Sequence, residues 1–234
     1  MTQEQMRTNI ERIRRELEEA SAGRYPVPRL MAVTKTRTPE EILPLQGMGI
    51  TEIGENRVQE LKGKLPAVGG AFRIHLIGRL QRNKVRQIIT DVNMIQSVDS
   101  VPLAEEISLR AANAGIRMDV LAEVSIAGEE QKGGVPFEET ERFLREIAPM
   151  EGIRVKGLMT VMPLTEDEAY LDGLFAKMRT LFEEIRDAGI PGTEIEELSM
   201  GMSGDYRLAA RHGATVVRVG SAIFGPRDYS KQKY

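Results

Sequence analysis

The chain has 234 residues, a length that suits one large domain or two small ones, and 41% of its residues are apolar. It contains no cysteine and has a formal net charge of −3, which argues against disulfides, thiolate catalysis, iron–sulfur clusters, Cys-based zinc sites and a basic surface for nucleic acid or anionic lipid. Because the N-terminus is polar and no apolar run approaches about 20 residues, we expect a soluble, cytoplasmic protein that binds neither nucleic acid nor membrane.

The first predicted element is an amphipathic helix within residues 1–22. Ile10, Ile13 and Leu17 recur there at helical spacing among charged residues, and Gly23 follows where the helix should end. We expect this helix to pack on the repeating part of the domain as an extra N-terminal element.

Eight short apolar runs follow, separated by longer amphipathic stretches. The runs cover residues 30–34, 50–53, 73–77, 94–98, 120–126, 155–161, 195–199 and 215–219. Parallel strands need crossover connections, and the amphipathic stretches supply them. Eight such units predict an α/β fold, a (β/α)8 TIM-type barrel, with an open doubly wound sheet as the alternative. No Pro/Gly/Ser-rich linker is found, so we expect a single domain over residues 1–234.

Several connecting stretches carry helix-start signals. Thr38 is an expected N-cap with Pro39 at the first helical position, and Asp99 or Ser100 is expected to cap the helix that contains residues 104–114. Further helices are predicted over residues 136–150, over residues 165–188, and from a cap at Ser203 through residue 211.

Lys35 follows the first strand, at the end of the barrel where function is expected. Side chains alternate along a strand, so Lys35 shares a face with Met31 and Val33. If this face points into the barrel, the amine lies above apolar neighbours and loses basicity, and its neutral form can attack an aldehyde to make an imine. From position alone, a solvated surface lysine is the more frequent outcome.

The second and third strands lead to Asn56 and His75. His75 alternates with Ile74 and Leu76, so we expect it to face the barrel interior. A hydrogen-bonded structural histidine is the favoured interpretation, and Asn56 could equally cap the following helix. The other histidine, His212, is far away in sequence, so no transition-metal site is expected.

Small and hydroxyl residues follow the last two strands. The loop after the seventh contains Ser199 and Ser203, and the loop after the eighth contains Gly220 and Ser221. Helix N-termini bind phosphate through free N–H groups, and these two loops are the usual phosphate site of a barrel. Tight turns without a ligand are an equally supported alternative.

Arg218 interrupts the valine-rich eighth strand. A charge in such a strand must be paired or must bind something. Two interpretations stay open, namely a salt bridge to Glu55 or Glu123 and a guanidinium aimed at a ligand.

Taken together, these segments resemble the pyridoxal 5′-phosphate (PLP) homeostasis proteins, the YggS-like family. The similarity spans nearly the whole chain in order. The matching stretches are AVTKT around Lys35, GENRVQE from Gly54, HLIGRLQRNK from His75, SVDS from Ser97, GLMTVMP from Gly157, LSMGMSGDY from Leu198 and RVGSAIFGPRDY from Arg218. The resemblance implies a barrel like the N-terminal domain of bacterial alanine racemase, with PLP bound.

The resemblance also implies roles for individual residues. Lys35 matches the Schiff-base lysine, and Arg218 matches the arginine near the pyridine nitrogen. The remaining matches are Ser199, Gly220 and Ser221 as phosphate contacts, Ser203 as a further candidate, and Asn56 and His75 as pocket residues. Two positions depart from the family pattern, since Ser125 stands where asparagine is frequent and Ser221 where threonine is frequent. Ser221 keeps the hydroxyl group that threonine would supply, whereas the role of Ser125 is left open.

These matches predict a PLP-binding protein of vitamin B6 homeostasis rather than an enzyme. A carbanion-stabilising PLP enzyme needs a protonated ring nitrogen, and Arg218 stays charged and cannot take up that proton. A two-base racemase also needs a second catalytic residue, and the barrel accounts for nearly all of this chain. We therefore expect a protein that stores PLP on Lys35 and passes it to apo-enzymes, and the resemblance suggests that it is a monomer. The alternatives are a racemase-like PLP enzyme and a Schiff-base aldolase for a phosphorylated sugar.

Overall fold

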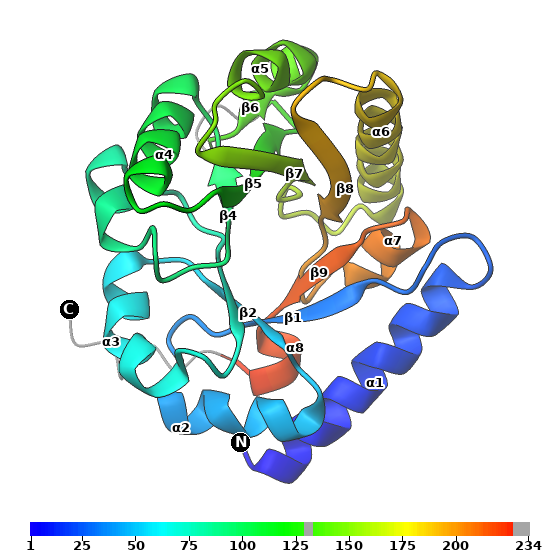
Figure 1. The fold of residues 1–234 in the computed structure, drawn as a ribbon. Helices are drawn as coiled ribbons and strands as arrows, with labels where there is room; N and C mark the ends of the chain where they lie inside the picture. The colour runs from blue at the N-terminus through cyan, green and yellow to red at the C-terminus, as the bar shows by residue number, and fades with distance from the viewer. Residues whose placement is uncertain (129–132, 227–234) are drawn as a thin grey trace.

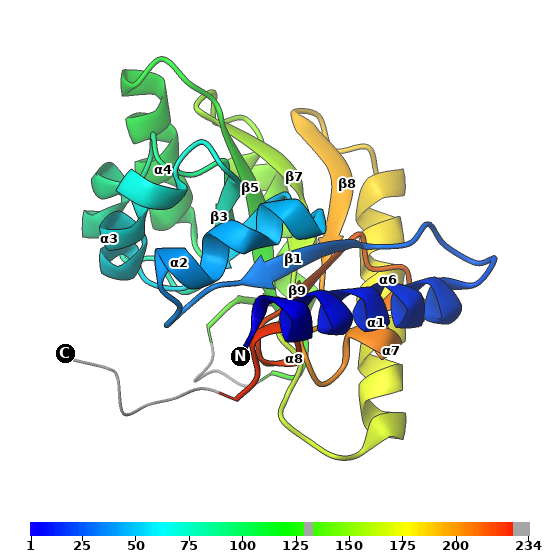
Figure 2. The same cartoon turned by 90° about the horizontal axis from the view of Figure 1, so that it is seen from below.

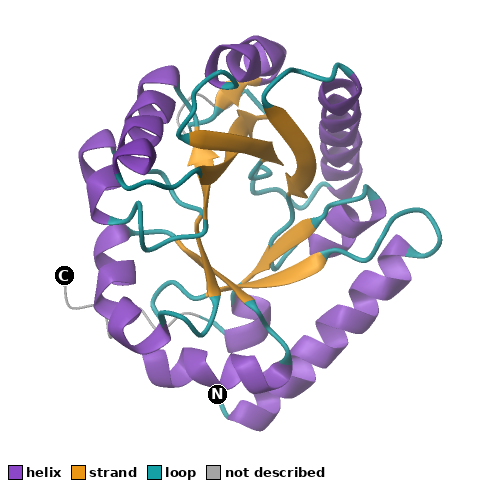
Figure 3. Ribbon diagram, viewed as in Figure 1, coloured by secondary structure: helices purple, strands orange, loops and turns teal. Residues whose placement is uncertain are grey.

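The computed structural model describes residues 1–128 and 133–226, and in them eight parallel strands form a closed barrel inside a ring of helices (Figures 1 and 3). The barrel strands pair in the order β4-β3-β2-β1-β9-β8-β7-β5, and β4 also pairs with β5, which closes the ring. They are β1 (Arg29–Val33), β2 (Glu52–Glu55), β3 (Arg73–Leu76), β4 (Met94–Val98), β5 (Met118–Ser125), β7 (Ile153–Met159), β8 (Thr193–Ser199) and β9 (Val216–Val219). The predicted (β/α)8 barrel is confirmed, and the open-sheet alternative is wrong.

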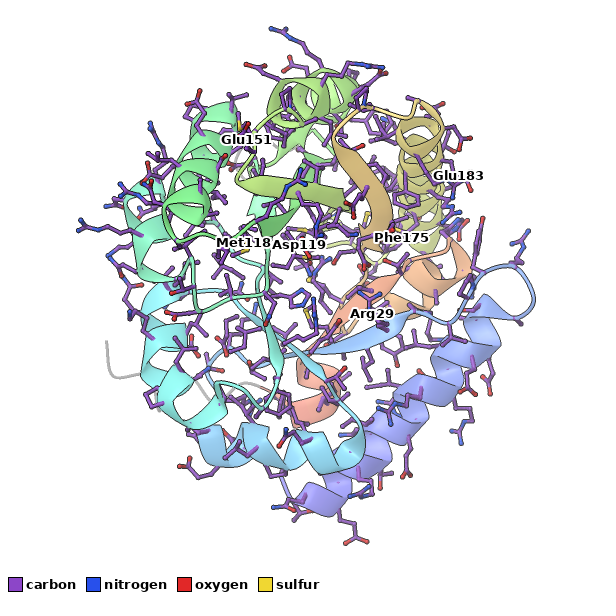
Figure 4. The ribbon with its side chains drawn as sticks, viewed as in Figure 1. Arg29, Met118, Asp119, Glu151, Phe175 and Glu183 are labelled. Atoms are coloured by element: carbon purple, nitrogen blue, oxygen red, sulfur yellow. The ribbon has the colours of Figure 1, made fainter. Side chains whose placement is uncertain are left out.

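The helices cover the outside of the barrel. They are α1 (Gln3–Ser21), α2 (Pro39–Ile42), α3 (Val58–Val68), α4 (Val101–Asn113), α5 (Thr140–Ile147), α6 (Glu168–Asp187), α7 (Tyr206–Arg211) and α8 (Ser221–Phe224), with 3-10 helices η1 (Leu43–Met48), η2 (Arg82–Gln87) and η4 (Phe137–Glu139). In α6, buried Leu174, Phe175 and Met178 recur at helical spacing and face the strands, whereas Glu183 lies on the outer side (Figure 4).

The extra N-terminal helix is confirmed as α1. A capping box between Thr2 and Gln5 starts it, and Ile10, Ile13 and Leu17 are buried. The helix runs along the outer side of the barrel beside β1 and packs on α7 and α8 (Figure 2). It therefore supports the two short helices that follow the last two barrel strands.

Two predicted helix starts differ from the structure, one by a single residue and one in its capping residue. The helix predicted over residues 136–150 is present but starts one residue later, since Pro136 belongs to β6 (Val135–Pro136), which pairs with β5, and η4 at residue 137 leads directly into α5. Ser203 is not a cap, because α7 starts after Asp205. The Ser203 hydroxyl instead accepts hydrogen bonds from the loop after β9, a partner far away in sequence.

The amino ends of the strands are closed by ion pairs. Arg29 contacts Glu52 and Glu197, with N–O distances of 3.3 and 2.9 Å, and Arg154 contacts Asp119 at 2.6 Å. Figure 4 shows Arg29 and Asp119 toward the middle of the ring. Paired charges at this end suit a stabilising role, which leaves the opposite end for a ligand.

In the described part of the chain, no helix is long and apolar enough to cross a membrane. The same residues hold no group of three or more His, Asp or Glu side chains that could bind a metal ion.

Candidate functional site

A cavity of about 450 Å³ lies at the carboxyl ends of the strands, and this volume is in the range of small-molecule sites. It brings together six of the eight predicted site residues, namely Lys35, Asn56, Ser203, Arg218, Gly220 and Ser221. The remaining wall consists of Val33, Arg37, Ile77, Val161, Leu164, Met202, Gly204 and Phe224. His75 and Ser199 do not line the cavity; they lie in the buried barrel interior.

The register of β1 explains why Lys35 reaches the cavity. Met31 is the β-sheet partner of Arg218, so the ends of β1 and β9 meet at one edge. Lys35 and Val33 both line the cavity, as the predicted alternation of faces requires. Thr36 follows with φ 66°, the only positive φ of a non-glycine residue in the described ranges. The turn after Lys35 thus has a backbone conformation that its surroundings must stabilise.

A buried ion cluster supplies that support, and we call Lys64, Glu55 and Glu60 the Lys64 cluster. Lys64 Nζ donates to Glu55 Oε1 at 2.8 Å and to Glu60 Oε1 at 2.7 Å. It also donates to the carbonyl oxygen of Thr34 at 2.8 Å. The N–H of Thr36 donates to Glu60 Oε1. The cluster therefore binds the backbone on both sides of Lys35.

Glu55 ties the cluster to β2. Its Oε1 accepts the hydroxyl of buried Thr34 at 2.5 Å, whereas its Oε2 has no hydrogen-bond partner among the described residues. Burial raises the pKa of the Glu55 carboxyl, and the nearby Lys64 ammonium opposes that effect. The carboxylate thus depends on Lys64 for its charge.

The two loops predicted to hold a phosphate are joined through Ser203. Its Oγ accepts the N–H groups of Gly220 at 3.1 Å and Ala222 at 3.2 Å. Because the oxygen accepts both bonds, the Ser203 hydroxyl proton can point into the cavity. At Gly220, a Cβ atom would lie 3.3 Å from the carbonyl oxygen of Val33, so a small residue suits this close approach. Ser221 adds an exposed hydroxyl at the start of α8.

Arg218 is held in the barrel interior without an ion pair to a described carboxylate. Its Nη1 donates to Ser199 Oγ and its Nη2 to the carbonyl oxygen of Thr160, both at 2.7 Å. Burial lowers the pKa of the guanidinium to about 10, with Asp205 and Glu123 opposing the shift. The group remains charged at neutral pH, and neither predicted salt bridge, to Glu55 or to Glu123, forms.

A chain of hydrogen bonds continues from Arg218 to His75. Ser199 Oγ donates to Gln96 Oε1 at 2.7 Å, and the Gln96 amide nitrogen lies 2.9 Å from His75 Nδ1. Burial lowers the pKa of His75 to about 3, with the charges of Arg73 and Arg29 acting in the same direction. Neutral His75 therefore accepts at Nδ1, as the structural interpretation of this histidine expected.

The sequence reasoning missed Gln96 and Lys64. A polar Gln96 in the middle of the apolar strand Met94–Val98 was a detectable signal, by the argument used for Arg218. Lys64 lacked a comparable signal because lysine is common on exposed helix faces. Ser125, whose role was left open, lines a separate cavity with Gly134 and Phe137.

Glu123, near the end of β5, is a half-buried acid close to Arg218. Its carboxyl has a pKa raised to about 7 by burial and by the charge of Asp99, while Arg218 and Arg79 oppose the rise. The unfolded carboxyl titrates near 4.5. Folding therefore takes up a proton between these pH values, and the stability contributed by Glu123 falls as pH rises from about 4.5 to about 7.

Glu123→Gln should remove this pH dependence. The variant should gain stability relative to wild type by about 3 kcal/mol between pH 4.5 and pH 8, since one pKa unit corresponds to about 1.4 kcal/mol. Urea unfolding of both proteins across this pH range measures the difference, in which the titration of His75 cancels. Parallel stability curves would contradict a raised Glu123 pKa.

Comparison with known proteins identifies the family. The family model for the alanine racemase N-terminal domain matches residues 2–228. A pyridoxal phosphate homeostasis protein of Aquifex aeolicus is 39% identical over 222 residues, which are 94% of this chain and 96% of the relative. The chain belongs to the family of pyridoxal phosphate homeostasis proteins. The human member is 36% identical over 217 residues, which cover 88% of this chain and 78% of the human protein.

Solved structures agree with this family assignment. PipY of Synechococcus elongatus with PLP bound is 32% identical, with a TM-score of 0.80 and coverage of 91% of this chain and 100% of PipY. An alanine racemase of Clostridium difficile has a TM-score of 0.76 at 16% identity, over 96% of this chain and 57% of the racemase. The racemase therefore shares the barrel fold, and the resemblance seen in the sequence is confirmed at the level of the family.

Proposed function

We propose that this protein stores PLP as a Schiff base on Lys35 and serves intracellular vitamin B6 homeostasis. The observation that carries the proposal is the convergence of Lys35, Ser203, Ser221 and Arg218 on one cavity of about 450 Å³. PLP needs an amine, a phosphate cradle and a group at the ring nitrogen, and this cavity offers all three. The family membership and the PLP-bound PipY structure support it.

Each part of the cofactor is assigned to different residues of the cavity. We assign the aldehyde end to Lys35 and the ring nitrogen to Arg218, with Asn56 beside the ring. Ser203, Gly220 and Ser221 would hold the phosphate through hydroxyl and N–H groups. His75 and Ser199, which were expected to contact the cofactor, would act instead by orienting Arg218 through the Gln96 chain of hydrogen bonds.

Arg218 also argues for storage rather than turnover. When bound, PLP supplies an aldehyde for the imine and a ring that withdraws electrons most strongly when its nitrogen is protonated. The Arg218 guanidinium stays charged and only donates hydrogen bonds, so it does not keep the ring nitrogen protonated. We therefore propose a PLP carrier, monomeric and cytoplasmic, that passes the cofactor to apo-enzymes. The cysteine-free sequence suits a reducing compartment.

The test combines site mapping with an activity assay. Borohydride reduction of the PLP-loaded protein should place a pyridoxyl group on the Lys35 peptide, located by mass spectrometry. Pyridoxal, which lacks the phosphate, should label the same lysine far less at equal concentration. A principal adduct on another lysine would overturn the site.

The same loaded protein should racemise or transaminate alanine no faster than free PLP. Turnover at enzyme-like rates, on the order of 1 per second or more, would refute storage and favour the racemase-like alternative.

A further inference from the structure

A second cavity, of about 610 Å³, lies beside the first at the carboxyl ends of β2, β3 and β4. Asn56 lines both cavities and forms part of the wall between them. The other lining residues are Arg57, Val58, Gln59, Arg79, Leu80, Gln81, Arg82, Lys84, Asp99, Ser100 and Leu103. None of these other residues has a part in the proposed storage of PLP.

The charge of this second cavity is strongly positive. Four cations, which we call the basic set, line it: Arg57, Arg79, Arg82 and Lys84. Asp99 is the one acid among the described residues of the lining, although the whole chain has a net charge of −3. Converging like charges repel one another, so an anion placed among them would be strongly stabilised.

The basic set also lacks internal partners. Within residues 1–128 and 133–226, no ion pair joins any of the four to a carboxylate, whereas cations elsewhere, such as Arg154 with Asp119, are paired at short range. None of their guanidinium or ammonium groups is therefore held at ion-pair distance by a described carboxylate, although the charge of Arg79 acts on the pKa of Glu123. They remain available to an external anion.

Uncharged polar groups without described partners lie beside the same space. The 11-residue helix α3 begins at this cavity, with Arg57 at its N-cap and no side chain bonded to its first turn. Free N–H groups at a helix start favour phosphate. The buried Asn56 Oδ1 has no hydrogen-bond partner among the described residues. An occupant that carries both an anionic group and a hydroxyl would satisfy both features.

We propose that this second cavity binds the phosphate group of a small molecule, independently of Lys35. A concave space of this volume suits a small ligand rather than a flat protein surface. Proteins commonly bind phosphate through arginine and lysine donors together with the N–H groups at a helix start. The source of the phosphate is either inorganic phosphate or a phosphate ester the size of a B6 vitamer.

Calorimetric titration at low salt tests the proposal. Pyridoxine 5′-phosphate, the alcohol analogue of PLP, cannot form an imine, so it reports noncovalent binding. We expect two sites on the wild-type protein and one after the Lys35 cavity is filled by PLP and borohydride. The remaining site should weaken at least about tenfold in the double variant Arg79→Gln/Lys84→Gln, which removes two charged donors. Parallel titration with inorganic phosphate distinguishes a phosphate site from an ester site.

Arg86→Gln is the matched control, because Arg86 is an exposed cation on the same helix η2 and does not line the cavity. Its titration should match wild type within about twofold, as expected for a charge outside the cavity. The proposal is overturned if neither probe binds outside the Lys35 cavity, or if the double variant and the control weaken binding equally. Failure of borohydride to label Lys35 would instead refute the proposed storage role, since the second site is judged from the Arg79/Lys84 variant alone.

Discussion

The variant Lys35→Ala should lose the visible absorbance of the PLP imine completely and should retain no cofactor through dialysis. Among residues 1–128 and 133–226, Lys35 is the only lysine that lines the 450 Å³ cavity, so no second described amine there can replace it. The phosphate cradle and Arg218 remain, and noncovalent binding should persist with an affinity weaker by about 100-fold or more, a cost of about 3 kcal/mol. Absorbance spectra and titration of fluorescence quenching measure both effects.

Lys62→Ala is the control for this variant. Lys62 is an exposed lysine of α3 that lines neither cavity, so its replacement should leave both the imine band and the PLP affinity unchanged. An imine band of normal intensity in the Lys35→Ala variant would assign the cofactor to a different lysine. An unchanged circular dichroism spectrum and melting temperature would show that the loss is local.

Lys64→Met should cost about 3–5 kcal/mol of unfolding free energy at neutral pH, the usual result of removing one member of a buried ion pair. The Glu55 side chain is fully buried and Lys64 is nearly so, at 0% and 9% exposed. Without the ammonium, Glu55 is left as an uncompensated buried charge or must bind a proton. Urea unfolding at pH 7 measures the loss, and it should shrink at lower pH as Glu55 becomes protonated.

The same change should disturb the imine as well as the fold. The Lys64 cluster binds the carbonyl of Thr34 and the N–H of Thr36, so its loss should release the turn that presents Lys35. A slower rate of imine formation and a shifted pH midpoint of the imine band, measured below the unfolding transition, would identify Lys64 as a positioning residue. A merely structural role would leave both unchanged in the folded protein.

Two further variants test whether the lost stability comes from the buried Lys64–Glu55 pair. Lys62→Met, two residues along the same helix on an exposed position, should change stability by less than about 0.5 kcal/mol. The double variant Lys64→Met/Glu55→Gln should recover part of the loss, because the buried charge is removed with its partner. If Lys64→Met lost as little unfolding free energy as Lys62→Met, the stabilising role of the Lys64–Glu55 pair would be contradicted.

Local patterns in the sequence were enough for the barrel. Each of the eight predicted strands is present, with ends displaced by a few residues, because alternation and apolar content report which residues are buried whatever their distant partners are. The helix predicted over residues 136–150 starts one residue late, since Pro136 belongs to β6, which forms only by pairing with β5. Ser203 was misassigned for a similar reason, because its partners Gly220 and Ala222 lie in another loop.

The candidate site divides in the same way. Lys35, Arg218 and the two loops could be selected from the sequence, because each breaks a local pattern at the end of a strand. That Met31 pairs with Arg218, and so brings Lys35 beside the phosphate loops, is a matter of barrel register. The links from Lys64 to the Lys35 turn and from Arg218 to His75 join residues that are 19 to 103 positions apart within single hydrogen bonds.

The sequence by itself therefore determined which stretches are strands and helices, and which polar residues stand where an apolar or solvated one would be expected. Only the tertiary structure decided which of those residues share a cavity, which are buried with a partner, and that four cations converge on a second space beside Asn56. The physical reason is that backbone state and burial are encoded by near neighbours. The meeting of distant side chains depends instead on how the whole barrel closes.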